Sequence, residues 1–135
     1  MAGLTLGGPE ELPVSVVVVA SVLAVAAIAA RFWAQLAMGD SWRIGQDQTE
    51  STALVTAGPF RFVRNPIYTA MIVFFAAVLV VLPNVATAVS FVATILAIEL
   101  VVRGVEEPFL RERHGAAYAD WCAQAGRFLP GIGRA

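Results

Sequence analysis

The stretch IELVVRGVEEPFLRER, residues 98–113, places ionisable side chains where an apolar run ends. In helical register Glu99, Arg103 and Glu106 or Glu107 share one face of the chain. Glu99 lies inside the apolar run, where a charge is costly, so we expect it to pair with Arg103 one turn on. Arg103 and Glu107 have the spacing of a second ion pair.

Pro108 predicts that this helix opens. It lacks the N–H that would bond to the carbonyl of Gly104, and its ring crowds the same carbonyl. We therefore expect a kink or an opening between Gly104 and Pro108, with Glu106 and Glu107 beside it. Two carboxylates next to freed backbone groups suit a cationic or hydroxyl-bearing ligand. A charged boundary at the edge of a membrane accounts for the same residues.

A second motif, GPFRFVRNPIY, runs from Gly58 to Tyr68. Its Asn65-Pro66 step is typical of a helix start, because Asn can cap free amides and Pro loses nothing at the first helical position. A helix N-terminus carries roughly half a positive charge, to which Arg61 and Arg64 add. The motif favours an anion site, and arginines that anchor a membrane helix explain it equally well.

Beyond Pro108 a stripe of side chains recurs at helical spacing, formed by Leu110, His114, Tyr118 and Trp121. The stripe is typical of an amphipathic helix that lies on the membrane or folds back over the site. Such stripes are more often packing than cofactor contact. We expect His114 to be structural and Cys122 to be a small buried apolar residue.

Composition indicates an integral membrane protein. The chain has 135 residues, the length of one domain, and 59% of them are hydrophobic. A helix crosses a bilayer with about 20 apolar residues, and three stretches come near that length: residues 12–36, 67–82 and 85–102. The predicted fold is therefore all-α, a single membrane domain over residues 1–135. A lone cysteine and the lack of a Cys/His cluster predict no disulfide and no metal site.

The basic residues, all nine of them arginines, predict how the spans are oriented. The Pro83-Asn84 turn between the second and third spans carries no charge, whereas arginines flank the first connection and follow the third span. By the positive-inside rule segments 39–65 and 106–135 then lie in the cytoplasm. We expect a protein of the cell membrane with its site on the cytoplasmic side, where 106–135 forms a broken helix and a Gly/Pro-rich tail.

Together the two motifs resemble the isoprenylcysteine carboxyl methyltransferase family, part of a wider group of membrane methyltransferases that includes the phospholipid N-methyltransferases. The family's pattern is a G-P-[FY] turn, an R-[HN]-P-x-Y helix start, a span, R-x-x-E-E-x-x-L, and G-x-x-Y before R-[FY]-x-P. Asn65 stands where many members have His, which removes a titratable group. The matching residues are Gly58, Pro59, Phe60, Arg64, Asn65, Pro66, Tyr68, Arg103, Glu106, Glu107, Leu110, Gly115, Tyr118, Arg127, Phe128 and Pro130.

The resemblance implies that S-adenosylmethionine binds in a cytoplasmic pocket built by both motifs, beside a lipid-lined tunnel for an apolar acceptor. We expect Arg64 to meet the cofactor's carboxylate, and Glu106 or Glu107 its ammonium and ribose. Arg103 is the expected catalytic residue, orienting a carboxylate acceptor while Glu107 holds its guanidinium. The expected cofactor-binding residues are Gly58, Phe60, Arg64, Asn65, Pro66, Tyr68, Glu106, Glu107, Leu110 and Tyr118.

The function that fits these expectations best is methyl transfer to a lipophilic acceptor, most simply O-methylation of a carboxylate on a fatty or isoprenoid chain. N-methylation of a phospholipid amine is the nearest alternative, and it requires a base. Sterol reductases with a nicotinamide cofactor share the wider group but suit a longer chain. A non-enzymatic membrane scaffold or subunit, whose arginines bind anionic headgroups, would need neither Glu106 nor Glu107.

Three spans are fewer than the better-known members of the family have. A homodimer would complete the tunnel, and small residues on the first span would let two helices approach closely; they are Ala20, Ala24, Ala27 and Ala30. The expected partners are thus a lipophilic acceptor, membrane lipids and a second copy of the chain. No nucleic acid is expected.

Overall fold

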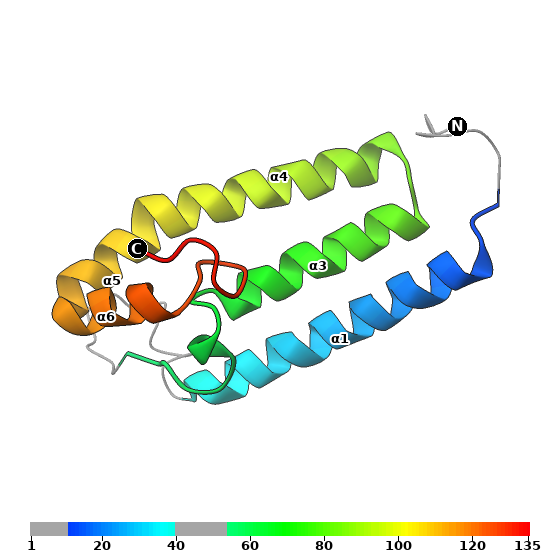
Figure 1. Ribbon diagram of the computed structural model, residues 1–135. Helices are drawn as coiled ribbons and strands as arrows, with labels where there is room; N and C mark the ends of the chain where they lie inside the picture. The colour runs from blue at the N-terminus through cyan, green and yellow to red at the C-terminus, as the bar shows by residue number, and fades with distance from the viewer. Residues whose placement is uncertain (1–10, 40–53) are drawn as a thin grey trace.

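The computed structural model describes residues 11–39 and 54–135, and the regular secondary structure of this part is helical apart from one isolated β-bridge (Figure 1). Three long helices run side by side, and two short ones lie at one end. They are α1 (Val14–Met38), α3 (Pro66–Val81), α4 (Val85–Val101), α5 (Glu107–His114) and α6 (Ala116–Gln124), with a 3₁₀ helix η1 (Gly58–Arg61) and a π-helix η2 (Val102–Glu106) between them. The predicted all-α fold is confirmed for these residues.

Within residues 11–39 and 54–135, two helices are long and apolar enough to cross a membrane: α1 and the continuous helix Val85–His114. α3 is equally apolar, but its 16 residues are fewer than the about 20 that an upright span needs. All three helices lie within two residues of the predicted stretches 12–36, 67–82 and 85–102. The count of three spans stays a prediction.

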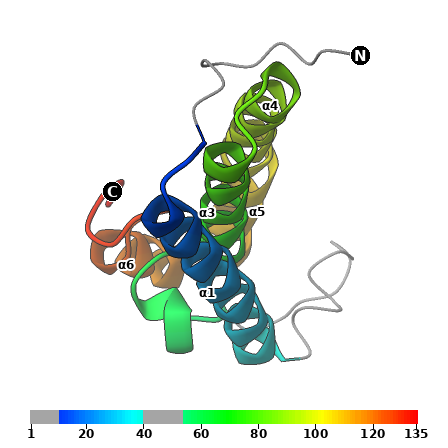
Figure 2. The same ribbon diagram turned by 90° about the vertical axis from the view of Figure 1, so that its right-hand side faces the viewer.

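α1 packs along α3, which lies between α1 and α4 (Figure 2). The buried residues of the two helices are small: Ala20, Ala27 and Ala34 recur every seven residues on α1, opposite Ala70 and Ala77 of α3. Small side chains let two helix backbones approach closely. Ala20 and Ala27, two of the four alanines that suggested a dimer contact, therefore serve the contact within one chain. The homodimer stays a prediction.

The helix that begins with α4 opens where the sequence predicts. The N–H of Glu107 bonds to the carbonyl of Val102, five residues back, so one turn is wider than an α-turn. Pro108 follows in the first turn of α5, where its missing N–H costs little. The predicted opening between Gly104 and Pro108 is confirmed, and it takes the form of a π-turn, which is frequent at functional sites.

The amphipathic helix expected after Pro108 is divided into α5 and α6, in line with the broken helix expected for residues 106–135. Gly115 ends α5 with a positive φ of 51°, a conformation that favours glycine, and α6 starts in a new direction. Tyr118 and Trp121 are nevertheless buried, and Leu110 packs against their cluster from α5. The stripe marks the packed side chains correctly although two helices carry them.

The core at this end of the bundle joins η1 to α6. The indole N–H of Trp121 donates to the carbonyl of Phe60 over 2.8 Å, and the two rings lie 6.4 Å apart. Tyr118 meets Trp121 edge-on at 6.0 Å, and its burial raises the pKa of its hydroxyl, which stays protonated. Cys122 is buried in the same cluster, as predicted.

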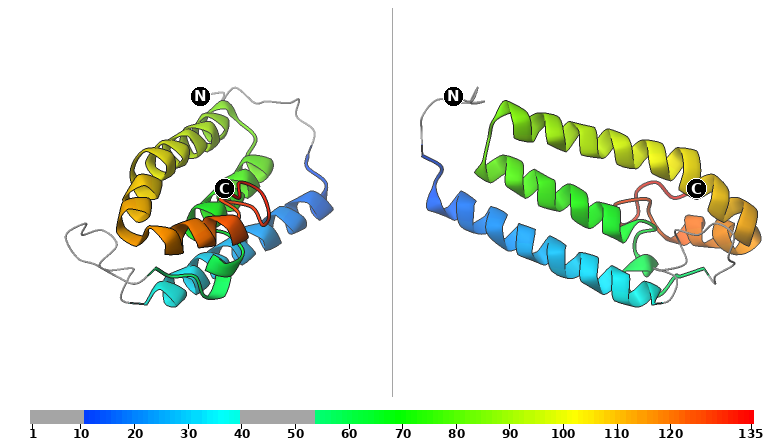
Figure 3. Two further views of the ribbon diagram at one scale, coloured as in Figure 1. Left: turned by 60° about the vertical axis from the view of Figure 1, so that its left-hand side comes forward. Right: turned by 180° about the vertical axis from the view of Figure 1, so that it is seen from behind.

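The C-terminal tail returns to the start of α3 (Figure 3). The N–H of Arg64 donates to the carbonyl of Gly126 over 2.8 Å, and the N–H of Gly126 donates to the carbonyl of Phe62 over 3.1 Å. A Cβ on Gly126 would lie only 1.8 Å from the carbonyl oxygen of Leu129. The tail can therefore make this turn only with glycine at that position.

Replacing that glycine should loosen the tail. Gly126→Ala forces two backbone segments apart, an overpacking that costs about 1–3 kcal/mol and lowers the melting temperature measured in detergent. Gly104→Ala is the matched control, because a Cβ there meets nothing within 4 Å. Equal melting temperatures for Gly126→Ala and the wild type would show that the tail does not pack as described.

Candidate active site

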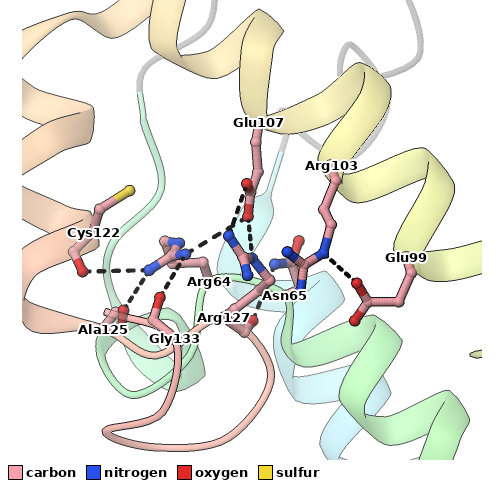
Figure 4. A network of polar contacts seen from close by, with 9 residues as sticks. All are labelled: Arg64, Asn65, Glu99, Arg103, Glu107, Cys122, Ala125, Arg127 and Gly133. Carbon is pink, nitrogen blue, oxygen red and sulfur yellow. Dashed lines mark hydrogen bonds and ion pairs between the residues drawn. The ribbon is translucent and has the colours of Figure 1, made fainter. Parts of the chain in front are cut away.

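Arg64 links the start of α3 to the C-terminal tail. Its side chain is 3% exposed, and its terminal nitrogens donate to the carbonyls of Ala125 (2.6 Å), Cys122 (3.4 Å) and Gly133 (3.1 Å) (Figure 4). One of them also lies 3.6 Å from a carboxylate oxygen of Glu107. The end of α6 supplies the carbonyls of Cys122 and Ala125, and the tail supplies that of Gly133.

Glu107 is the carboxylate that balances this charge. It accepts two hydrogen bonds from Arg127, one from Nε at 2.6 Å and one from Nη2 at 3.2 Å. Its side chain is 11% exposed. The hydrogen bonds to Glu107 raise the pKa of Arg127, so this guanidinium stays charged. We call Arg64, Glu107 and Arg127 the ion cluster.

The position of Arg64 differs from the expected anion site. Burial and three carbonyl partners turn its terminal nitrogens toward the protein, and its Nε is buried without a partner among the described residues. A cofactor carboxylate would have to displace the tail to reach it. Binding of the cofactor by Arg64 remains a prediction, and the structure gives the residue a structural role.

Arg103 forms one of its two expected ion pairs. Its Nε donates to Glu99, which confirms that pair, whereas the expected pair with Glu107 is replaced by those of Glu107 with Arg127 and Arg64 (Figure 4). The reason is burial: Glu107 points into the protein, where Arg64 needs an anion, while the Arg103 side chain is 57% exposed. Glu99, and not Glu107, orients the guanidinium of Arg103.

Glu106 lies on the open turn and has a different partner. The hydroxyl of Tyr68, from the first turn of α3, donates to its carboxylate over 2.5 Å. Within residues 11–39 and 54–135, no arginine or histidine lies within ion-pair distance of Glu106. The two neighbouring glutamates thus differ: Glu107 is buried and doubly paired, whereas Glu106 is half-buried and free to meet a cation.

Asn65 occupies the predicted N-cap position of α3, but its side chain does not cap the helix. Its amide instead donates to the carbonyl of Arg127 over 3.0 Å. The hydroxyl of Thr69, one turn on, lies 2.7 Å from the carbonyl of Phe128. The carbonyls of the tail accept hydrogen bonds from Asn65 and Thr69 that could otherwise form within α3. The start of α3 is therefore a docking surface for the C-terminal residues.

The other predicted cofactor-binding residues fall into two groups. Phe60, Leu110 and Tyr118 belong to the packed core around Trp121. Gly58 begins η1 with a φ of 60°, as the predicted turn requires, and Pro66 is buried in the first turn of α3. Contact with a cofactor stays a prediction for all five.

Sequence reasoning missed the partner of Glu107. Arg127 belongs to the R-F-x-P end of the family pattern, which was noted without a role. A signal was present, since a buried glutamate next to Pro108 needs a cation and the tail supplies one. Thr69 was missed as well, because a hydroxyl in the first turn of a helix usually bonds within its own helix.

A sequence model described as "Phospholipid methyltransferase" (PEMT) matches residues 15–117. The chain belongs to the phospholipid methyltransferase family. The match includes α1, α3, α4 and α5 with Arg64, Glu106 and Glu107, and it ends before Arg127. No curated protein matches the chain.

Membership of the phospholipid methyltransferase family confirms the wider group of membrane methyltransferases. It makes the chain a membrane enzyme of the methyltransferase class, in agreement with its two long apolar helices. The closer resemblance to the isoprenylcysteine carboxyl methyltransferases stays a prediction.

The two glutamates should respond oppositely to the same change. Glu107→Gln leaves buried guanidinium groups without their anion, which costs about 3 kcal/mol, and should lower the melting temperature in detergent clearly. Glu106→Gln keeps a partner for Tyr68 and should change the stability by less than about 1 kcal/mol. A Glu107→Gln protein as stable as Glu106→Gln would argue against the ion cluster.

Proposed function

We propose that the protein transfers a methyl group from S-adenosylmethionine to a lipid acceptor at the cytoplasmic surface of the membrane. The observation that carries the proposal is the pair of unlike glutamates at the opened helix of a methyltransferase family member. Glu107 balances the buried charge of Arg64, and Glu106 offers beside it a carboxylate that has no cationic partner among the described residues. In this proposal α3 is the third span. By the positive-inside rule, the arginines of segments 39–65 and 106–135 favour a cytoplasmic position for the end of the bundle that carries the ion cluster.

The residues at the opening fit the charges of S-adenosylmethionine. Glu106 can hold its ammonium group, and Tyr68 keeps that carboxylate in place. Arg127, 22% exposed at the edge of the ion cluster, suits the cofactor's carboxylate better than the buried Arg64. When bound, S-adenosylmethionine supplies an electrophilic methyl group on a sulfonium. The protein's part is to align the acceptor and keep water out.

The exposed guanidinium of Arg103 favours a carboxylate as the acceptor. Glu99 accepts a hydrogen bond from the Nε of Arg103, so the two terminal nitrogens of Arg103 can donate to two carboxylate oxygens of an acceptor. A carboxylate is ionised and nucleophilic at neutral pH and needs no base. Arg103 then has the catalytic role of orienting it on a fatty or isoprenoid chain, with Glu99 in the place expected for Glu107.

A phospholipid amine is the second candidate, favoured by the family match and by Glu106. An amine must lose a proton before it attacks, and an unpaired carboxylate beside a tyrosine hydroxyl can take that proton. In this case Glu106 serves the acceptor rather than the cofactor.

Calorimetric titration tests the cofactor. S-adenosylmethionine should bind the wild type saturably, and Glu106→Gln should weaken binding by about tenfold or more, as loss of a charge-assisted hydrogen bond does. Glu112→Gln is the control, because Glu112 is an exposed glutamate of α5. No binding by folded wild type would refute the cofactor, and equal binding by Glu106→Gln would refute the role of Glu106.

The pH dependence of the rate separates the two acceptors. With oleic acid the rate should be flat above about pH 8, where the carboxylate is ionised even though the membrane raises its pKa. With phosphatidylethanolamine it should rise about tenfold per pH unit below the pKa of the amine. Transfer of radioactive methyl to each lipid gives the profile, and Arg103→Lys should slow only the carboxylate reaction, since it loses the bidentate fork. Failure of both lipids as acceptors would contradict the proposed chemistry.

A further inference from the structure

An apolar groove of about 210 Å³ lies between α1 and α3, away from the ion cluster. Ile28 lines it from α1, and Met71, Phe74 and Phe75 line it from α3. The buried alanines that bring the two helices together leave room beside these larger side chains. The groove therefore follows the flank of two proposed membrane helices, where lipid chains are the surrounding medium.

Arg31 is the one charged side chain among the described residues that line this groove. Its guanidinium lies over the ring of Phe32, 5.8 Å from the centroid, and no carboxylate among the described residues pairs with it. Arg31 is seven residues from the end of α1, so it lies about 10 Å along the helix from that end. A cation at this depth needs an anionic partner or a route to the interface.

The groove has a direction. α1 runs toward the site end and α3 runs away from it, so Arg31 and Met71 lie nearer the site and Phe74 and Phe75 lie deeper. Tyr68, Met71 and Phe75 are spaced three and four residues apart, so they share a face of α3. That face leads from the groove to the hydroxyl that bonds Glu106.

We propose that this groove binds a membrane phospholipid, with one acyl chain along Met71, Phe74 and Phe75 and the phosphate on Arg31. Arginine recognises phosphate through paired N–H donors, and the apolar walls suit a hydrocarbon chain. A second copy of the chain fits less well. α1 and α3 carry no carboxylate, and the one on α4, Glu99, is already paired. The site goes beyond the proposed reaction and does not depend on it.

Native mass spectrometry of the full chain in detergent, titrated with dioleoylphosphatidylglycerol, tests this site. Arg31→Gln should raise the dissociation constant of the tightest-bound lipid about tenfold. Arg61→Gln is the matched control, since Arg61 also lies over the phenylalanine that follows it, at 5.3 Å, but outside the groove. It should leave the constant within twofold. Dioleoylglycerol, which lacks the phosphate, should bind both variants and the wild type alike.

Ile28→Trp fills the groove while keeping Arg31, and it should also displace the lipid. Unchanged binding by Arg31→Gln, or an equal loss in Arg61→Gln, would overturn the site in favour of general charge attraction. Should Arg31→Gln fail to fold, Ile28→Trp and Arg31→Lys test the same site. Unchanged lipid binding by both of these variants would overturn it. Binding of S-adenosylmethionine should stay unchanged in every folded variant, so that this proposal and the proposed reaction can fail separately.

Discussion

The architecture depends on one buried guanidinium. Arg64 cannot lie inside the protein unless carbonyls and an anion surround it, and these groups come from segments far apart in sequence: the end of α6, the tail and the start of α5. Its environment therefore holds α3 against α5, α6 and the tail. Gly126 allows the sharp return that brings the tail carbonyls within reach.

Because Arg64 needs an anion, the two adjacent glutamates have different roles. Consecutive residues of a helix point about 100° apart, so when Glu107 turns inward to the ion cluster Glu106 must point elsewhere. The π-turn lets it meet Tyr68 across from α3. A carboxylate that no cation of the described residues pairs with, next to a fixed cluster of charges, is a place where a cationic ligand can bind without disturbing the fold. One helical segment thus supplies both the carboxylate that stabilises the fold, Glu107, and the carboxylate that can bind a ligand, Glu106.

Sequence predicted what depends on local pattern. The helices followed from apolar length, the opened turn from Pro108, and the Glu99–Arg103 pair from four-residue spacing. The contacts made by the C-terminal tail could not be predicted in this way. Spacing along the chain does not say which distant carbonyl or guanidinium will contact a given side chain. The sequence therefore suggested that Asn65 caps α3 and that Arg64 binds an anion. Both side chains instead donate to carbonyls that follow α6. The small residues of α1 were likewise ambiguous between a contact within one chain and one between two chains.

The central claim is that the opened turn between α4 and α5 is the place of methyl transfer to lipid. The most direct measurement incubates the purified protein in liposomes of phosphatidylethanolamine and oleic acid with methyl-labelled S-adenosylmethionine, and counts label in the extracted lipid. We expect labelled lipid from the wild type and little from Glu106→Gln of unchanged melting temperature, as the proposed reaction requires. Equal labelling by both proteins, or none by folded wild type, would contradict it.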